Sequence, residues 1–136
     1  MIQKFDHVGL VVKDTQETVA LFSNLFGFEI SNSLTFSEEG FKSTLISKEG
    51  VRIELIEPIG PEGMIQRFVQ KRGWGLHHIS IQVDRIEDEM VLLKEKGAQF
   101  VSEEARVTKG TSNKTAFIHP NTTRGILIEL IQRALI

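Results

Sequence analysis

Apolar and polar side chains alternate along two stretches of the chain, residues 7–12 and residues 78–83. In the second stretch Ile79, Ile81 and Val83 point to one side and the polar residues between them point to the other. A repeat of two residues is typical of a β-strand that is buried on one face. The pattern therefore predicts two related strands, one in each half of the chain.

A helical pattern follows each of these strands. The first begins at a cap, Asp14 or Thr15, and ends at Gly27, while the second runs from about Ile86 to Gly97. Shorter strands are predicted after the two helices, at residues 28–36, 42–47 and 51–57 and at residues 100–102, 114–119 and 126–132. The pattern thus predicts the order β-α-β-β-β twice, which belongs to the α+β class.

An internal repeat relates the two halves. The segment Ile53-Glu54-Leu55-Ile56 is identical to Ile128-Glu129-Leu130-Ile131, and a glycine stands three residues before each. Likewise, His7-Val8-Gly9-Leu10-Val11-Val12 resembles His78-Ile79-Ser80-Ile81-Gln82-Val83. Matches in the same order indicate a duplicated module of about 60 residues. We therefore expect a single domain over residues 1–136, made of a first module at residues 1–60, a helical connector at residues 61–73 and a second module at residues 74–136.

Composition narrows the function classes. The chain has 16 basic and 18 acidic residues and a net charge of −2, so it has no basic excess to neutralise nucleic-acid phosphates. It has no cysteine, which excludes disulfides, thiolate metal sites and cysteine nucleophiles and favours a cytoplasmic location. No apolar run reaches the roughly 20 residues of a membrane span, and the N-terminus does not resemble a signal peptide. We expect a protein that binds neither nucleic acid nor membrane.

Two glutamates lie in strands that are otherwise apolar. Glu54 stands between Ile53 and Leu55, so its side chain leaves the opposite face of the strand, and Glu129 is placed in the same way in the second module. An unpaired buried carboxylate is costly. The simpler interpretation is that both glutamates face water, but their repeat-related positions favour a function.

Two histidines complete this pattern. His7 and His78 stand at repeat-related positions, at the start of the first alternating stretch of each module. If the modules pair about a pseudo-twofold axis, two imidazoles and two carboxylates converge, and this donor set suits a divalent metal such as Ni, Co, Zn, Mn or Fe. Four protein ligands in an octahedral site leave two positions for water or substrate. His77 lies on the opposite, apolar face, which predicts a packing or capping role.

Five segments together resemble a known family. They are His7-Val8-Gly9-Leu10-Val11-Val12-Lys13-Asp14, Ile53-Glu54-Leu55-Ile56-Glu57-Pro58, Gln70-Lys71-Arg72-Gly73-Trp74-Gly75-Leu76-His77-His78-Ile79, Ala116-Phe117-Ile118-His119-Pro120 and Gly125-Ile126-Leu127-Ile128-Glu129-Leu130. With these segments the chain resembles the vicinal oxygen chelate superfamily, the glyoxalase/bleomycin-resistance group, and within it the methylmalonyl-CoA epimerases. The resemblance implies two βαβββ modules that curl into a cup-shaped mixed sheet, and a homodimer. It also implies one divalent metal ion per chain, bound by His7, Glu54, His78 and Glu129.

The resemblance further implies a reaction. In the family, two substrate oxygens chelate the metal while a base removes the proton beside the chelated carbonyl, and reprotonation on the other face inverts the centre. For an epimerase the small-molecule substrate is an acyl-CoA, methylmalonyl-CoA, with Glu129 as the first candidate for the base and Glu54 as the second catalytic residue. Some epimerases carry another glutamate on the third strand, whereas residues 42–46 of this chain contain no carboxylate.

Two other functions fit the same residues. A glyoxalase I-type lactoylglutathione lyase acts on a thiol adduct, the hemithioacetal of methylglyoxal, and its bacterial-type members use the same His/Glu/His/Glu quartet. A metal-free binding or resistance protein is the alternative from another class, and the retention of all four ligand-type residues argues against it. A CoA enzyme also needs cations for the phosphates, and the candidates, unless they are merely solvated charges, are Lys42, Lys109, Lys114 and Arg124.

Overall fold

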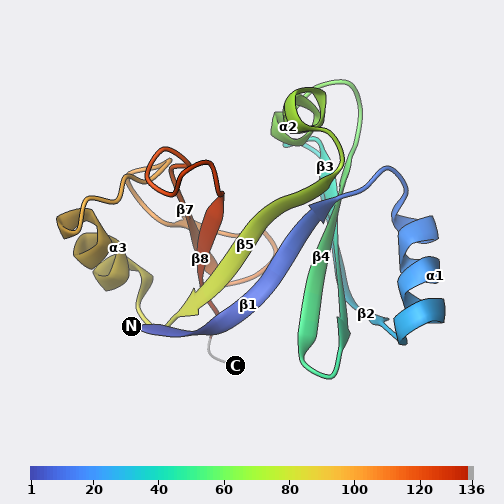
Figure 1. The fold of residues 1–136 in the computed structure, drawn as a ribbon, viewed down its shortest axis with the longest axis horizontal. Helices are drawn as coiled ribbons and strands as arrows, with labels where there is room; N and C mark the ends of the chain where they lie inside the picture. Colours follow the sequence, from blue (N-terminus) through green and yellow to red (C-terminus); the bar gives the residue numbers. More distant parts are fainter. Residues whose placement is uncertain (135–136) are drawn as a thin grey trace. The chain divides into compact units, whose positions relative to one another are not determined.

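The computed structural model describes residues 1–134 (Figure 1). Residues 135–136, the end of the range expected for the second module, lie outside the described residues. The strands are β1 (Ile2–Val11), β2 (Glu29–Phe36), β3 (Phe41–Lys48), β4 (Val51–Pro58), β5 (Gly75–Val83), β6 (Arg106–Val107), β7 (Lys114–Ile118) and β8 (Ile128–Gln132), and the helices are α1 (Thr15–Phe26), α2 (Met64–Arg72) and α3 (Ile86–Glu95). Two β-α-β-β-β series flank α2, which confirms the predicted α+β class and duplicated topology. No helix in this part of the chain is long and apolar enough to cross a membrane.

The described chain forms two compact units. The first unit contains residues 7–77, and the second unit contains residues 1–6 together with the chain from His78 onward. The first six residues belong to the second unit because this part of β1 neighbours β5, where the side chain of Gln82 donates a hydrogen bond to Gln3 at 3.0 Å. The units therefore divide the chain within β1 and within β5, and the module boundaries expected from the repeat stay a prediction.

In the first unit the strands follow the order β2-β3-β4-β1. β1 pairs with β4 in parallel, and β3 pairs antiparallel with both β2 and β4. The helix α1 begins where the carboxylate of Asp14 accepts a hydrogen bond from the backbone N–H of Glu17 at 3.0 Å. It ends at Gly27, which takes a left-handed φ of 78°. Both ends are the ones that the sequence predicts.

Different helices pack against the two faces of this sheet. The helix α1 covers one face, in a core that contains the buried residues Phe28, Ile46, Ile53 and Leu55. The helix α2 packs at the other face, where Ile65 joins Val11 and Ile56 in a second cluster. Because side chains alternate along a strand, Glu54 shares its face with Ile56 and points away from the core under α1.

The second unit repeats this plan. Its strands follow the order β5-β8-β7-β6, with β5 parallel to β8 and the other pairs antiparallel. The helix α3 covers one face, in a core that contains the buried residues Val83, Ile86, Met90, Ala116, Ile118 and Leu130. Glu129 precedes Leu130 and therefore points to the opposite face. In the first unit, Glu54 lies on the face opposite α1. In the second unit, Glu129 lies on the face opposite α3.

One predicted strand is wrong. The pattern predicted the first short strand of the second module at residues 100–102, but this strand, β6, is Arg106–Val107. Phe100 forms an isolated bridge with Ile118 instead. Its ring packs against the core under α3, and the Nζ atom of Lys94 lies 5.9 Å from the centre of that ring. The backbone N–H of Val101 also donates to the carbonyl of Phe117 at 2.9 Å, so backbone pairing around this one bridge and packing of the ring together position the segment.

Two loops of the first unit cross closely at glycine residues. The backbone N–H of Ile59 donates a hydrogen bond to the carbonyl of Gly40 at 2.7 Å. Gly63 precedes α2 with a φ of 112°, and a β-carbon at this residue would lie 2.6 Å from the carbonyl oxygen of Glu39. Any side chain at residue 63 therefore meets both backbone strain and a clash with backbone that cannot easily move.

We expect Gly63→Ala to lower the free energy of unfolding by about 3 kcal/mol, because about 1 kcal/mol of conformational strain adds to about 2 kcal/mol of overpacking. Gly60→Ala is the matched control: Gly60 also has a positive φ, 76°, but a β-carbon there meets no atom within 4 Å. Urea unfolding followed by circular dichroism measures both variants. Equal losses in the two would show that the loop crossing does not contribute to stability.

Candidate metal-binding site

The first unit places a histidine beside a glutamate. The parallel pairing of β1 and β4 sets Gly9 opposite Glu54. His7 lies two residues before Gly9 on the same face, and the glycine leaves space beside the carboxylate. The Nε2 atom of His7 therefore lies 3.5 Å from Oε1 of Glu54. His7 is buried, whereas 22% of the Glu54 side chain is exposed.

The other oxygen of Glu54 is held from β3. The hydroxyl of Ser43 donates a hydrogen bond to Oε2 of Glu54 at 2.6 Å. The register sets Leu45 opposite Glu54, so Ser43 is the diagonal neighbour on the same face. This hydroxyl stands in the stretch where the sequence offers no carboxylate. It stabilises a carboxylate that is partly removed from water.

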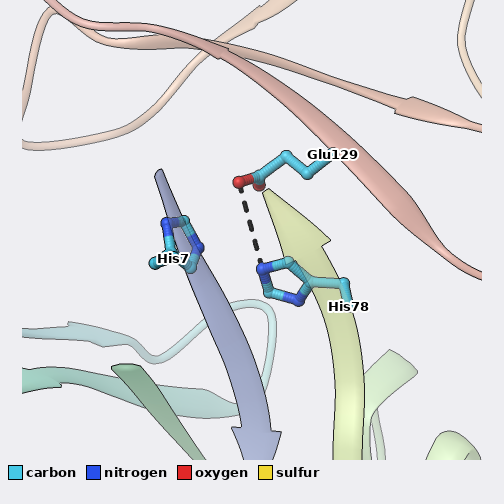
Figure 2. A group of neighbouring side chains, drawn as sticks. All are labelled: His7, His78 and Glu129. Carbon is cyan, nitrogen blue, oxygen red and sulfur yellow. Dashed lines mark ion pairs between the residues drawn. The ribbon is translucent and has the colours of Figure 1, made fainter. Parts of the chain in front are cut away.

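The second unit contains an equivalent histidine–glutamate pair that is more deeply buried. The parallel pairing of β5 and β8 sets Ser80 opposite Glu129, and His78 lies two residues before Ser80. The Nε2 atom of His78 lies 3.9 Å from Oε1 of Glu129, the ion pair drawn in Figure 2, where His7 is also seen on β1. The hydroxyl of Ser80 donates to the same oxygen at 2.7 Å. His78, Ser80 and Glu129 are all buried, and the ring of Phe117 packs edge-on against His78.

The hydroxyl donors break the symmetry of the repeat. Ser80 corresponds by repeat position to Gly9, and Ser43 corresponds to Thr115. Ser80 therefore reaches its glutamate from the parallel neighbour β5, whereas Ser43 reaches its glutamate from the antiparallel neighbour β3. The two units share the histidine–glutamate pair but support it with a serine from opposite sides of the glutamate strand.

Each pair offers suitable donors for a divalent metal. Imidazole nitrogens and carboxylate oxygens are ligand types that Zn, Co, Ni and Mn accept. A serine that donates to a ligating carboxylate also fixes the orientation of that carboxylate. The residues present therefore fit the expected metal. The structure places His7 beside Glu54 and His78 beside Glu129, and the binding of a metal by these four residues stays a prediction.

His77 packs against a helix. Its ring meets the ring of Phe68 in α2 edge-on, with 4.6 Å between the ring centres. Burial lowers the pKa of the His77 imidazole below its ordinary value, and the carboxylate of Glu54 partly offsets this shift. A neutral imidazole packed on an aromatic ring agrees with the structural role that strand alternation predicted for His77.

Two of the candidate phosphate-binding lysines lie on faces that do not carry the histidine–glutamate pairs. Lys42 alternates with Ser43 along β3 and stands opposite Glu57, so it points away from the face that carries Glu54. Lys114 lies on the α3 side of β7, and its Nζ atom is 3.1 Å from a carboxylate oxygen of Glu87. Lys109 and Arg124 lie in loops. The structure therefore gives Lys42 and Lys114 no place at either histidine–glutamate pair.

Comparison with known proteins identifies the family. The family model of the glyoxalase/bleomycin resistance protein/dioxygenase superfamily matches residues 6–117. The chain belongs to this superfamily. Human mitochondrial methylmalonyl-CoA epimerase is 32% identical to this superfamily member over 131 residues, which cover 95% of this chain and 73% of the human protein. The ethylmalonyl-CoA/methylmalonyl-CoA epimerase of Cereibacter sphaeroides is 29% identical over 97% of this chain and 99% of its own.

A solved structure agrees with these relatives. Methylmalonyl-CoA epimerase from Mycobacterium tuberculosis superposes with a TM-score of 0.90 at 26% identity, covering 98% of this chain and 90% of the other. Membership of the glyoxalase/bleomycin resistance protein/dioxygenase superfamily confirms the resemblance read from the five sequence segments. It also confirms the expected fold of two βαβββ modules.

Substitution of Ser43 and Ser80 tests whether their hydroxyls contribute to metal binding. We expect Ser43→Ala and Ser80→Ala each to weaken metal binding by about tenfold, because the glutamate carboxylate that is expected to bind the metal loses the hydrogen bond that orients it. Ser47→Ala is the matched control, since Ser47 lies on the same face of β3 but bonds the hydroxyl of Ser31. Calorimetric titration with Co(II) measures the affinities. Unchanged affinity in both serine variants would contradict this role.

Proposed function

We propose that this chain is a metal-dependent methylmalonyl-CoA epimerase whose single divalent metal is bound by His7, Glu54, His78 and Glu129. The observation that carries the proposal is the pair of repeat-related histidine–glutamate contacts, each with a serine hydroxyl on the carboxylate. Burying a carboxylate costs free energy, and proteins commonly contain buried carboxylates where these groups bind a cation or transfer a proton. The similarity to methylmalonyl-CoA epimerases supports the substrate.

In the proposed reaction the metal and the side chains have different roles. A divalent metal held by His7, Glu54, His78 and Glu129 would act as a Lewis acid for negative charge that develops on the substrate. The carboxylate of Glu129 accepts the proton from C2 of the acyl group, and its buried surroundings keep bulk water from that proton. Ser80 fixes Oε1 of Glu129, so the carboxylate approaches the substrate in a defined orientation.

Inversion requires a proton donor on the second face of the planar intermediate. The stretch at residues 42–46 has no carboxylate for this task. Glu54 belongs to the other module from Glu129, and Ser43 holds its carboxylate in place. Glu54 is more exposed than Glu129, which suits a group that must exchange its proton between turnovers. We therefore place Glu54 as the second catalytic residue.

Hydrogen–deuterium exchange tests the proposed function. Methylmalonyl-CoA incubated in heavy water with the metal-loaded protein should gain deuterium at C2, as mass spectrometry shows from the mass increase. That carbon also exchanges spontaneously, so the control is the same protein after removal of its metal by a chelator. Exchange that does not exceed the chelated control would exclude the epimerase.

The glyoxalase I-type lyase remains the second candidate because the same quartet of ligand types serves both reactions. Both reactions move a proton beside a metal-bound oxygen, so the four ligands do not distinguish them. Turnover of a glutathione or bacillithiol hemithioacetal without exchange at C2 of methylmalonyl-CoA would favour the lyase. Absence of both activities in a protein that also binds no metal would favour a binding or resistance protein.

The proposal includes two expectations about the protein in the cell. We expect a homodimer, as the family resemblance implies. We expect a cytoplasmic location, which suits a CoA-dependent enzyme and a chain without cysteine. Size-exclusion chromatography with light scattering checks the first, and a mass equal to one chain at micromolar concentration would contradict it.

A further inference from the structure

The segment between α2 and β5 presents an aromatic side chain that the proposed metal site does not use. Trp74 is 44% exposed, although it is the largest apolar side chain of the protein. Glycines flank it on both sides, and a β-carbon at Gly73 or Gly75 would meet no atom within 4 Å. The indole is therefore partly exposed on the first unit and has no side chain on either neighbouring residue.

One cation lies near the indole ring, and two more precede Trp74 closely in the sequence. The Nζ atom of Lys13 lies 5.8 Å from the centre of the Trp74 ring, within the range of a cation–π contact. Lys71 and Arg72 lie in the last turn of α2, three and two residues before the tryptophan, and both are exposed. Within residues 1–134, none of these three cations forms a salt bridge. Their charges are therefore available to an anionic ligand, in contrast to Lys114, which pairs with Glu87.

The distance to the proposed metal site matches one part of an acyl-CoA. His7 and Lys13 are six residues apart on the extended backbone of β1 and its continuation, where the N–H of Val12 still bonds the carbonyl of Ile56. Six residues of strand span about 20 Å. The arm of CoA from its sulfur to its ribose has about 18 bonds, as many as the backbone of six residues, and reaches up to about 20 Å.

We propose that Trp74, Lys13, Lys71 and Arg72 bind the nucleotide end of an acyl-CoA, with the adenine stacked on the indole and the phosphates paired with the three cations. Stacking on an aromatic side chain accepts any base, and cations placed around the ring add affinity for the phosphates. This inference rests on the proposed function, because it assigns a binding site to the CoA part of the proposed substrate. In this proposal Lys13, Lys71 and Arg72 take the role of phosphate contacts in place of Lys42 and Lys114, which strand pairing places on other faces.

The fluorescence of the intact protein reports on this site alone. The chain has one tryptophan and no tyrosine, so its emission on excitation at the indole band comes from Trp74. We expect CoA to quench this emission to saturation and adenosine 3′,5′-bisphosphate to reproduce the quenching. Pantetheine, which lacks the nucleotide, and inorganic phosphate, which lacks the base, should leave the emission unchanged. Quenching by phosphate alone would reduce the site to a general anion site and overturn the proposal.

Variants connect binding with catalysis. Lys13→Ala and Arg72→Ala should each weaken the binding of adenosine 3′,5′-bisphosphate by about tenfold. Trp74→Phe, followed by calorimetry because the fluorophore is lost, should do the same. In the exchange assay, the three variants should raise KM for methylmalonyl-CoA with kcat unchanged, and should match the unmodified protein on a methylmalonyl-pantetheine substrate. Lys42→Ala is the charge-matched control and should leave both constants unchanged.

The outcomes separate this inference from the function on which it rests. Normal exchange at C2 with no response of Trp74 to CoA would overturn the nucleotide site and leave the epimerase intact. Saturable quenching by adenosine 3′,5′-bisphosphate without any exchange would support the nucleotide site and remove the epimerase. A loss of affinity in Lys42→Ala equal to that in Lys13→Ala would show a general charge effect and would also overturn the site.

Discussion

Replacing Glu129 by glutamine should leave the metal bound and lower deuterium exchange at C2 by about 100- to 10,000-fold. The amide keeps the shape of the side chain, and its oxygen can still accept the hydrogen bond that Ser80 donates to Oε1 of Glu129. It can also still ligate a metal, but it cannot accept a proton at pH 7. Loss of a positioned general base costs a factor of this size. Mass spectrometry of the substrate measures exchange, and calorimetry with Co(II) measures the metal.

Glu54→Gln is the matched variant for this prediction. Glu54 has the same neighbours in kind, a histidine at 3.5 Å and a serine hydroxyl at 2.6 Å. If Glu129 removes the proton and Glu54 returns one to the other face, Glu54→Gln should slow inversion more than exchange. Exchange retained in Glu129→Gln with the metal bound would remove Glu129 as the base and transfer that role to Glu54.

Replacing His78 by alanine should weaken metal binding by more than about 100-fold, because a nitrogen ligand is lost outright rather than misoriented. His77→Ala is the neighbouring control. Its imidazole packs on Phe68 and faces α2, so we expect this variant to lose stability but to keep most of its metal affinity. Calorimetry of both variants at equal protein concentration gives the comparison, and circular dichroism confirms that each is folded.

Equal loss of metal affinity in His77→Ala and His78→Ala would contradict the assignment of their side chains to opposite faces of β5. His7→Ala extends the test to the first unit, where the imidazole lies beside Glu54. If His7→Ala binds metal as tightly as the unmodified protein, the site in the second unit works without the first, and the four-ligand site is wrong.

Strand alternation made the two histidine–glutamate pairs predictable from the sequence. The repeat located equivalent positions, and a period of two residues then fixed which side chains share a face. The serine donors were not predictable in this way, because Ser43 and Ser80 do not correspond to each other in the repeat. Their contacts depend on which strand neighbours each glutamate strand, and this pairing is a property of the fold rather than of any local pattern.

One predicted strand was wrong because local composition was given more weight than pairing. Lys42 and Lys114 were candidates for phosphate binding, with solvated charges as the alternative, and alternation with Ser43 and Thr115 places them on the faces that α1 and α3 cover. The strand expected at residues 100–102 has the right composition, but its pairing is limited to a bridge of Phe100 with Ile118, and the ring of Phe100 packs against the core under α3. Short strands are the elements in which such tertiary preference prevails over propensity.

The sharing of β1 between the two units has a consequence for the order in which they form during synthesis. Asp6 is buried, and both of its carboxylate oxygens accept hydrogen bonds from Arg133, which lies 127 residues later in the chain. At about 5–20 residues per second, translation delivers Arg133 roughly 6–25 s after Asp6. Residues 7–77 are complete much earlier. We therefore expect β1 to be fixed first at its C-terminal half. Residues 2–6 of this strand wait for β5 and the guanidinium of Arg133, so that contacts of high sequence separation are the last to form.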